Sequence, residues 1–153
     1  MRILGIDPGL ATMGYGIIEN NRFGRDISAD DIIAAAKTAQ AHDFISAMPD
    51  GYAHQLSSKG TNLSGGQKQR VLIARAIASK PEILILDDSS SALDYKTDAN
   101  LRKALDENMS GATVITVAQR VSSVKDCGLI IVLDEGKIIG IGDHEHLLEN
   151  CEE

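Results

Sequence analysis

The chain has 153 residues and a net charge of −7, from 15 lysines and arginines against 22 aspartates and glutamates. This length can bury one hydrophobic core, so we expect a single domain spanning residues 1–153. The acidic balance gives no electrostatic reason to expect nucleic-acid binding. The two cysteines fit no metal-ligand spacing, the apolar runs are too short to span a bilayer, and the start lacks a signal-peptide pattern. Together these features predict a cytoplasmic protein from a reducing compartment.

The segment from Met1 to Glu19 favours a β-hairpin. Arg2 to Ile6 is a short apolar run followed by Asp7, and Tyr15 to Ile18 is a second strand-like run beyond a glycine-rich connection. This segment resembles the start of the RuvC family of Holliday-junction resolvases, which have an RNase H-like fold. The resemblance implies that Asp7 is a ligand of catalytic Mg²⁺. The segments that supply that family's other carboxylates have no match here, so the alternative is a hairpin that only completes a sheet.

The stretch from Gly9 to Gly16 also matches half of the phosphate-binding pattern G-x-x-x-x-G-K-[ST]. Tyr15 stands where the lysine must reach the phosphates, and Gly16 stands where a hydroxyl must meet Mg²⁺. Because both binding groups are missing, we interpret this as a chance match.

Residues 21–62 are predicted to form a small helical subdomain. Ser28 and Asp31 fit a capping box with an acid in place of the usual Glu or Gln. Apolar residues then continue at helical spacing from Ile32 to Met48. The turn residues Pro49-Asp50-Gly51 end this pattern.

The helix start after Leu63 is suited to an anion. Ser64 can cap a helix whose first turn offers free N–H groups, and Gly65 and Gly66 let an anion approach the backbone closely. Val71 to Ala78 is almost entirely apolar or small, which predicts a helix buried on most sides.

A strand with two carboxylates follows that helix. Ile83 to Leu86 is an unbroken aliphatic run, typical of a strand covered on both faces of a parallel sheet. Asp87 and Asp88 come at its carboxyl end, where open α/β sheets bind their ligands. An anion-binding helix start and a carboxylate pair together predict a site for phosphate with Mg²⁺.

Three of these stretches resemble motifs of the ATP-binding-cassette (ABC) ATPases, in that family's order and spacing. Leu63 to Gln67 is similar to the signature motif, Ile83 to Asp87 to the Walker B strand, and Ser91 to Asp94 to the D-loop. The resemblance runs from about Asn21 to Glu153 and is of the exporter type. It implies an α/β fold with a P-loop-NTPase-like, mainly parallel sheet, flanking helices and a small helical subdomain. Residues 63–153 would form the cassette core, and the N-terminal β-hairpin, residues 1–20, would replace the P-loop part.

The resemblance also implies roles for individual residues. In ABC ATPases each ATP lies between the P-loop of one cassette and the signature of another. Ser64, Gly65, Gly66 and Gln67 would therefore contact the γ-phosphate of ATP bound to a partner cassette. Asp87 would hold Mg²⁺ through water.

The implied catalytic residues depart from the family pattern. Asp88 stands where the family has the glutamate that polarises the attacking water, and its side chain is one methylene shorter. Gln119 stands where the family has a histidine that contacts the γ-phosphate, and it cannot carry that charge. Both changes occur together in the hydrolysis-poor subunit of asymmetric exporters, which we infer as the parent. Asp94 of the D-loop is the third candidate catalytic residue.

The remaining elements follow from periodicity and turn signals. We expect a helix over Thr97 to Asn108, a buried strand over Ala112 to Val117, a β-hairpin over Leu129 to Leu133 and Lys137 to Ile141, and a short helix over His144 to Asn150.

Nothing in the sequence matches the family's P-loop lysine and hydroxyl, its adenine-stacking loop or its Q-loop. In P-loop folds the missing strand lies beside the switch strand, which corresponds to Thr113 to Val117. We therefore expect Ile3 to Ile6 to occupy that slot in the sheet, with Tyr15 to Ile18 alongside.

Three functions are consistent with these observations. The first is an engineered or recombined chimera of part of an ABC cassette and a resolvase hairpin, without native ATP hydrolysis. The second is a weak Mg-ATP-binding module that acts in trans with an intact cassette. The third is a metal-dependent junction nuclease that uses Asp7. The implied cofactors are ATP and Mg²⁺. The expected partners are a second copy or a cassette, and the parent would contact membrane transporter subunits.

Overall fold

The computed structural model describes residues 2–7, 14–19, 27–57 and 60–150. The chain divides into two compact units, Met1–Val117 and Ala118–Glu153, and each is described by itself. None of the helices in the described ranges combines the length and the apolar composition needed to cross a membrane.

The first unit is built on a four-stranded sheet in the order β2-β1-β3-β4. Its strands are β1 (Arg2–Asp7), β2 (Gly14–Glu19), β3 (Ile83–Asp87) and β4 (Thr113–Val117). β1 pairs antiparallel with β2, whereas β1 with β3 and β3 with β4 are parallel pairs. The expected N-terminal hairpin and the mainly parallel sheet are both confirmed.

The place of the hairpin in the sheet differs from the expectation. β1 lies on the side of β3 away from β4, with Ile3 opposite Ile83 and Ile6 opposite Leu86. The slot beside Thr113–Val117 is therefore not taken by the N-terminal strand, and β4 is an edge strand of the described sheet. The prediction was wrong because an apolar run indicates burial within a sheet, whereas pairing and register decide which strand becomes its neighbour.

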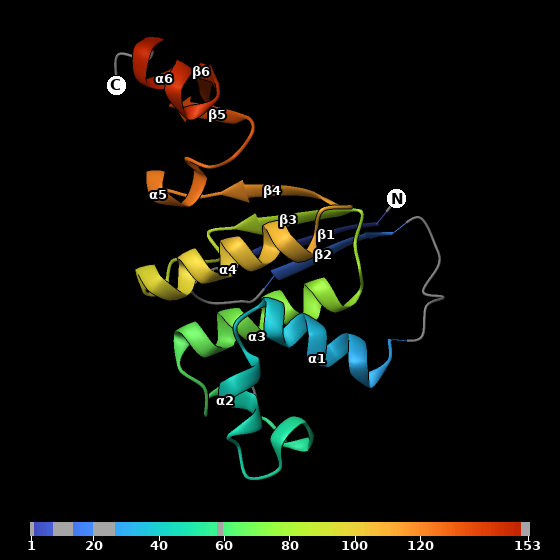
Figure 1. Ribbon diagram of the computed structural model, residues 1–153. Helices are drawn as coiled ribbons and strands as arrows, with labels where there is room; N and C mark the ends of the chain where they lie inside the picture. Colours follow the sequence, from blue (N-terminus) through green and yellow to red (C-terminus); the bar gives the residue numbers. More distant parts are fainter. Residues whose placement is uncertain (1, 8–13, 20–26, 58–59, 151–153) are drawn as a thin grey trace. The chain divides into compact units, whose positions relative to one another are not determined.

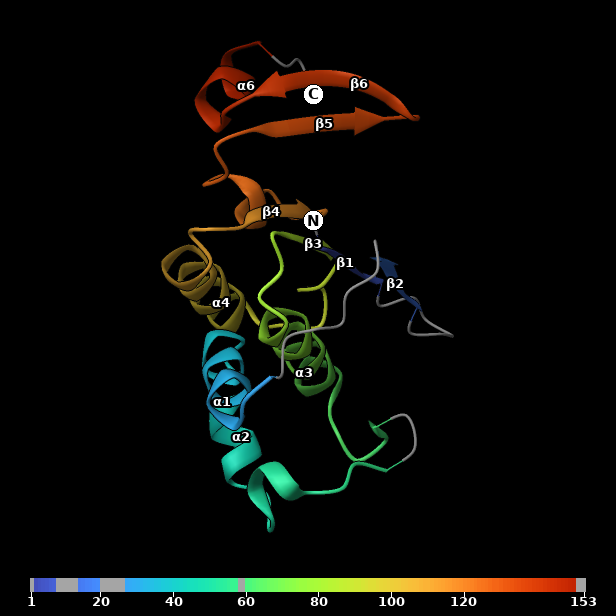
Figure 2. The ribbon, with the colours of Figure 1, turned by 90° about the vertical axis from the view of Figure 1, so that its right-hand side faces the viewer.

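Helices cover one face of this sheet. In Figures 1 and 2, α3 (Gly65–Ala78) and α4 (Tyr95–Asn108) lie along the sheet, and α1 (Ala29–Thr38) packs beside them on the same side. Leu84 and Leu86 of β3 are almost fully buried in the same core cluster as the inward residues of the helices. The helix residues of this core include Ala35, Ala36, Ile73, Ala76, Ile77, Leu101 and Leu105.

The other face of the sheet is less covered. Ile83 and Ile85 of β3 are only half-buried, and in β4 Ile115 is 45% and Val117 53% exposed. The sequence predicted coverage on both faces of β3 and a buried β4. Both expectations fail because the helices of this unit all lie on one side, and because β4 has a strand on one edge only in the described sheet.

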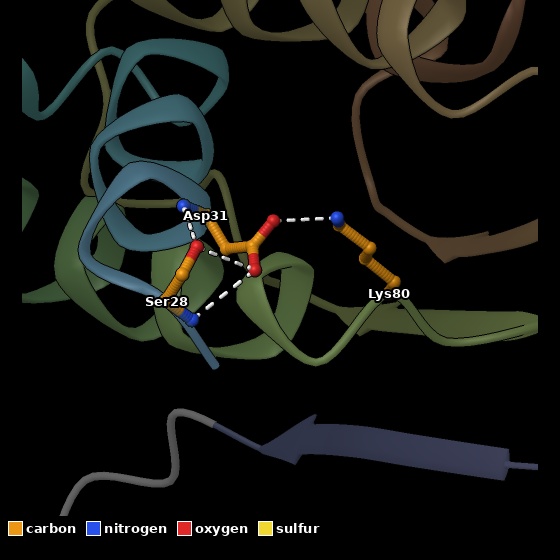
Figure 3. Close-up of polar contacts among 3 residues, drawn as sticks. All are labelled: Ser28, Asp31 and Lys80. Atoms are coloured by element: carbon orange, nitrogen blue, oxygen red, sulfur yellow. Dashed lines mark hydrogen bonds and ion pairs between the residues drawn. The ribbon is translucent and has the colours of Figure 1, made fainter. Parts of the chain in front are cut away.

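The capping box predicted at the start of α1 is confirmed. The N–H of Asp31 donates to Ser28 Oγ, and the N–H and hydroxyl of Ser28 donate to the Asp31 carboxylate. Lys80, which follows α3 with a φ of +48°, forms an ion pair with the same carboxylate. Figure 3 shows the Asp31 carboxylate between these two partners. This contact therefore joins the start of α1 to the end of α3.

α1 leads into two short helical segments, α2 (His42–Ser46) and the 3₁₀ turn η1 (Gly51–Ala53). Gln40, between α1 and α2, has a φ of +58°. On either side of it Ala39 and Ala41 are fully buried, so this junction is a packed part of the core.

The second unit contains α5 (Val121–Val124), β5 (Ile130–Asp134), β6 (Lys137–Gly142) and α6 (His144–Asn150). β5 and β6 pair antiparallel, and the positive φ angles of Glu135 and Gly136 fit the tight turn expected between them. The predicted hairpin and terminal helix are confirmed.

Candidate functional site

The first turn of α3 is held by a capping box. The N–H of Gln67 donates to Ser64 Oγ at 3.2 Å, and the N–H of Ser64 donates to Gln67 Oε1 at 2.9 Å. These bonds fix the turn from both ends. Gly65 and Gly66 lie inside it, at positions where a helix has no intrahelical acceptor for their N–H groups. Together with the positive end of the helix dipole, such groups attract an anion.

A pocket of about 380 Å³ opens at this helix start. One wall is the beginning of α3, and the other is the segment between β3 and α4 together with the first turn of α4. Its lining residues are Ser64, Gly65, Gly66, Arg70, Ala92, Leu93, Asp94 and Thr97. The structure thus brings the predicted signature-like residues and the predicted D-loop-like residues to one place.

The two walls lie close together at Gly66. A Cβ at this position would lie 3.0 Å from the carbonyl oxygen of Ala92. A Cβ at Gly65 would make an ordinary 3.5 Å contact with the side chain of Ala92. The close packing of the two walls therefore favours glycine at position 66, whereas position 65 has room for a Cβ.

Gln69 joins the walls behind the pocket, and the sequence analysis missed it. Its Nε2 donates to Ser91 Oγ at 3.1 Å, and its Oε1 accepts from the N–H of Ala92 at 3.1 Å. The side chain is 8% exposed. One signal was present in the sequence: Gln69 shares a helical face with Ile73 and Ala76, and a polar residue on an apolar face needs a buried partner.

Asp94 has a capping role in the pocket wall. Its Oδ1 accepts from the N–H of Thr97 at 2.9 Å, and its Oδ2 accepts from Thr97 Oγ1 at 2.7 Å. The hydrogen bond from the Thr97 N–H, followed by that from the Thr97 hydroxyl, lowers the pKa of Asp94. Because both carboxylate oxygens serve as the N-cap of α4, this geometry gives Asp94 a structural function. The catalytic role expected for it stays a prediction.

Asp88 follows β3 in a left-handed backbone conformation, with a φ of +44°. Its N–H donates to the carbonyl of Val117 at 2.9 Å, and its carbonyl accepts from Ser91 Oγ at 3.0 Å. Aspartate adopts this conformation more readily than most residues with a Cβ. Through Ser91, the backbone of Asp88 is connected to Gln69 and so to α3.

Three of the four aspartates with predicted metal or catalytic roles lie near the same end of the sheet. Asp87 ends β3, Asp88 follows it, and Asp7 ends the neighbouring parallel strand β1. Among the described side chains no group of three or more possible ligands could hold a metal ion. Two adjacent carboxylates suit Mg²⁺ that keeps water and phosphate ligands, rather than a site built from protein ligands alone.

Gln119 lies at the start of the second unit, and its side chain is exposed. Asp88 belongs to the first unit, and the role expected for Gln119 stays a prediction.

The chain matches the model of a known family. The model of the family described as "ABC transporter" matches residues 11–91. The matched range includes the α3 start at Ser64, together with Asp87 and Asp88, and it ends before Asp94. It begins at residue 11, inside the segment that resembles a resolvase hairpin.

The similar proteins include ABC transporters and proteins described as ATP-binding subunits. The chain is 46% identical to ABC transporter B family member 1 of Arabidopsis thaliana over 90% of its own length and 11% of that protein. It is 50% identical to an uncharacterized ABC transporter ATP-binding protein of Bacillus subtilis over 87% of its own length and 23% of that protein. It is 46% identical to the mitochondrial potassium channel ATP-binding subunit of Rattus norvegicus over 87% of its own length and 19% of that protein. The chain thus spans less than a quarter of these relatives.

The fold is similar to a solved structure of the same kind. A bacterial Atm1-family ABC exporter with ATP bound matches with a TM-score of 0.76 and 40% identity, over 83% of this chain and 22% of that one. The mixed α/β fold is therefore similar to the nucleotide-binding part of an ABC exporter.

Proposed function

This chain belongs to the ABC transporter family, and on that premise we propose that it supplies the signature side of a composite Mg-ATP site to an intact cassette. In this proposal residues 63–67 are the signature, residues 83–87 the Walker B strand and residues 91–94 the D-loop. ATP is held by the P-loop of the partner, and the start of α3 closes over its γ-phosphate. The chain by itself binds Mg-ATP weakly and does not hydrolyse it.

The observation that carries this proposal is the pocket at the start of α3. It combines first-turn N–H groups, the helix dipole and the guanidinium of Arg70, all of which favour a negatively charged group. Gly65 is exposed and lines the pocket. A terminal phosphate fits this arrangement better than an apolar or cationic ligand.

The weak binding of Mg-ATP by the chain itself would take place at its own Walker B strand, separate from the pocket at the start of α3, and Mg²⁺ would neutralise part of the charge on the phosphate oxygens there. Asp87 would hold it through water, since a pair of adjacent carboxylates leaves most of the coordination sphere to water and phosphate. Asp88 would stand next to the attacking water with a carboxylate one methylene shorter than glutamate. A misplacement of about 1 Å can cost about a hundredfold in rate, which supports the proposal that this chain by itself does not hydrolyse ATP.

The test is ATP-dependent association with an intact cassette. The ATP-binding domain of the Bacillus subtilis relative, blocked in its own hydrolysis, is mixed with this chain in the presence of Mg-ATP, and the complex is measured by analytical ultracentrifugation. We expect a one-to-one complex that needs ATP. Ser64→Ala removes the pocket-side cap and should weaken the complex, whereas Ser28→Ala removes the equivalent cap of α1 away from the pocket and should not. If the chain does not associate with the ATP-loaded partner, the proposal is overturned.

We further propose that the helical subdomain predicted over residues 21–62 faces a membrane subunit on its cytoplasmic side. The support is the family membership and the exposed surface of this segment, including Ile32 and Tyr52. Crosslinking from a cysteine introduced at Tyr52 into a reconstituted transporter tests this.

The resolvase-like origin of residues 1–19 is a separate proposal, based on its sequence resemblance alone. The family match that begins at residue 11 weighs against a junction between unrelated proteins near residue 20. A metal-dependent junction nuclease has one supporting observation, since Asp7 and Asp87 end neighbouring parallel strands. Incubation of a four-way DNA junction with the chain and Mg²⁺ tests it, and uncut DNA excludes it.

A further inference from the structure

Arg70 connects the start of α3 to the helical subdomain. Its Nη1 donates to the carbonyl oxygen of Gln40 at 2.7 Å, and its Nε donates to the carbonyl oxygen of Gly66 at 3.2 Å. Its guanidinium carbon also lies 4.8 Å from the centre of the Phe44 ring, a cation–π distance. One side chain therefore contacts the first turn of α3, the end of α1 and the beginning of α2.

The end of this connection at Gln40 is rigid. The left-handed backbone of Gln40 turns its carbonyl to Arg70, and the flanking Ala39 and Ala41 are fully buried. The N–H of Ala41 donates to the carbonyl of Ala36 at 2.7 Å, which closes the junction. A displacement at Arg70 cannot be absorbed here by a loose loop, so it must move α2 or break these contacts.

The other end of the connection lies in the pocket wall. Arg70 lines the pocket, and the Gly66 carbonyl that it contacts belongs to the first turn of α3, whose N–H groups have no intrahelical acceptor. Arginine is suited to this place because its planar fork can donate to two carbonyls while its face stacks on an aromatic ring. Lysine has no equivalent geometry.

We propose that Arg70 is a positioning residue that couples the occupancy of the pocket to the position of α2. This inference rests on the proposed function, since it requires a phosphate group at the start of α3. When that group binds, the first turn adjusts toward it, and Arg70 transfers the adjustment to Gln40 and Phe44. The same contacts hold the turn in its binding geometry before the ligand arrives.

The experiment uses a tryptophan reporter. The chain contains no tryptophan, so Phe44→Trp introduces a single probe beside Arg70. In this background Arg70→Lys keeps the positive charge but removes the planar guanidinium group. Arg75→Lys is the matched control at an exposed position of the same helix. Mg-ATP bound to the hydrolysis-blocked partner cassette is the ligand. We expect its addition to shift the tryptophan emission in the Phe44→Trp chain and in the Arg75→Lys control.

In the Arg70→Lys chain we expect no emission shift and a dissociation constant about three to ten times larger. An unchanged emission on binding with Arg70 present would overturn the inference. Weaker binding with the shift retained would also overturn it, because Arg70 would then act through direct contact with the ligand.

A measurement without ligand separates this inference from the proposed function. Hydrogen exchange is compared between Arg70→Lys and Arg75→Lys at the amides of Lys68, Ala41 and Ile45. Arg70→Lys should lower protection at both ends of the connection. Loss of protection in α3 alone would overturn the coupling. Because no ligand is used, this result does not depend on whether the partner cassette binds or the proposed function holds.

Discussion

Gln69 is a buried polar side chain that holds two elements together, and its removal should be measurable as a loss of stability. Gln69→Met keeps the approximate volume and removes both hydrogen bonds to residues 91 and 92. We expect the free energy of unfolding to fall by about 1–2 kcal/mol, since the hydrogen bonds are lost and their partners become unsatisfied. Urea denaturation followed by circular dichroism measures this.

The matched control is Gln55→Met on an exposed position, which should change the free energy of unfolding by less than about 0.5 kcal/mol. Equal effects of the two substitutions would contradict a buried role for Gln69.

The two glycines at the start of α3 should respond differently to alanine. At Gly66 the added Cβ meets the Ala92 carbonyl at 3.0 Å, so the pocket walls must separate by a few tenths of an ångström. At Gly65 the contact is ordinary, and the helix gains from the replacement of glycine. We expect the Gly66→Ala chain to be less stable than the Gly65→Ala chain by about 1 kcal/mol or more. Thermal denaturation of the pair decides this, and a reversed order would show that the walls are not in contact.

Residues with local functions were the easiest to predict. The caps at Ser64 and Ser28 need only a hydroxyl and a partner three residues later, and both were confirmed. Gln69 and Arg70 were missed because their partners lie 22 to 30 residues away in the chain. Sequence spacing carries no information about such partners until the fold is known.

At the scale of elements, the ion pair that joins α1 to α3 predicts a dependence of stability on pH. Hydrogen bonding to the Lys80 ammonium, followed by that to Ser28, lowers the pKa of Asp31 from 3.8 to about 2. The folded-state pKa lies below the unfolded value, so the unfolded chain binds the proton more readily. The stabilisation is therefore complete above about pH 4 and is lost as the pH falls from about 4 toward 2.

Asp31→Asn should remove this part of the pH dependence. Its stability should decline less than that of the parent chain between these pH values, as measured by urea denaturation at each pH. Asp30→Asn, an exposed position of the same helical turn, is the control and should leave the decline unchanged. Parallel curves for the parent and Asp31→Asn chains would rule out this role for the ion pair.

The strands show where prediction from sequence reached its limit. The aliphatic runs of β1, β3 and β4 were identified as strands, and the turn residues between β5 and β6 identified their hairpin. The order of the strands could not be predicted from the sequence. β1 and β4 are both apolar and both pair with β3, and nothing in their sequences shows which edge of β3 each one takes. An apolar strand also looks the same in sequence whether its second face is covered or open.

At the scale of the whole molecule, the buried apolar residues belong to the first unit. Every residue of the described core cluster lies between positions 35 and 109. In the described part of the second unit, Ser123 is the one buried residue, and apolar side chains of the hairpin such as Leu133 and Ile138 are more than half exposed. The sequence predicted the elements of both units, but an apolar pattern does not reveal which units share a core.

This uneven burial predicts that the β5–β6 hairpin opens more readily than the central sheet. A two-stranded hairpin is marginally stable in water without a packed face, and local opening is easiest where few apolar contacts are buried. Hydrogen exchange measured by mass spectrometry should show faster exchange over Ile130–Gly142 than over Ile83–Asp87 at neutral pH. The difference should disappear near the denaturant midpoint of the first unit, where both segments exchange through global unfolding. Equal protection of the two segments in water would mean that the exposed face of the hairpin is covered in solution. The covering partner would then be a second copy of the chain, and sedimentation measured over a range of protein concentrations would detect it.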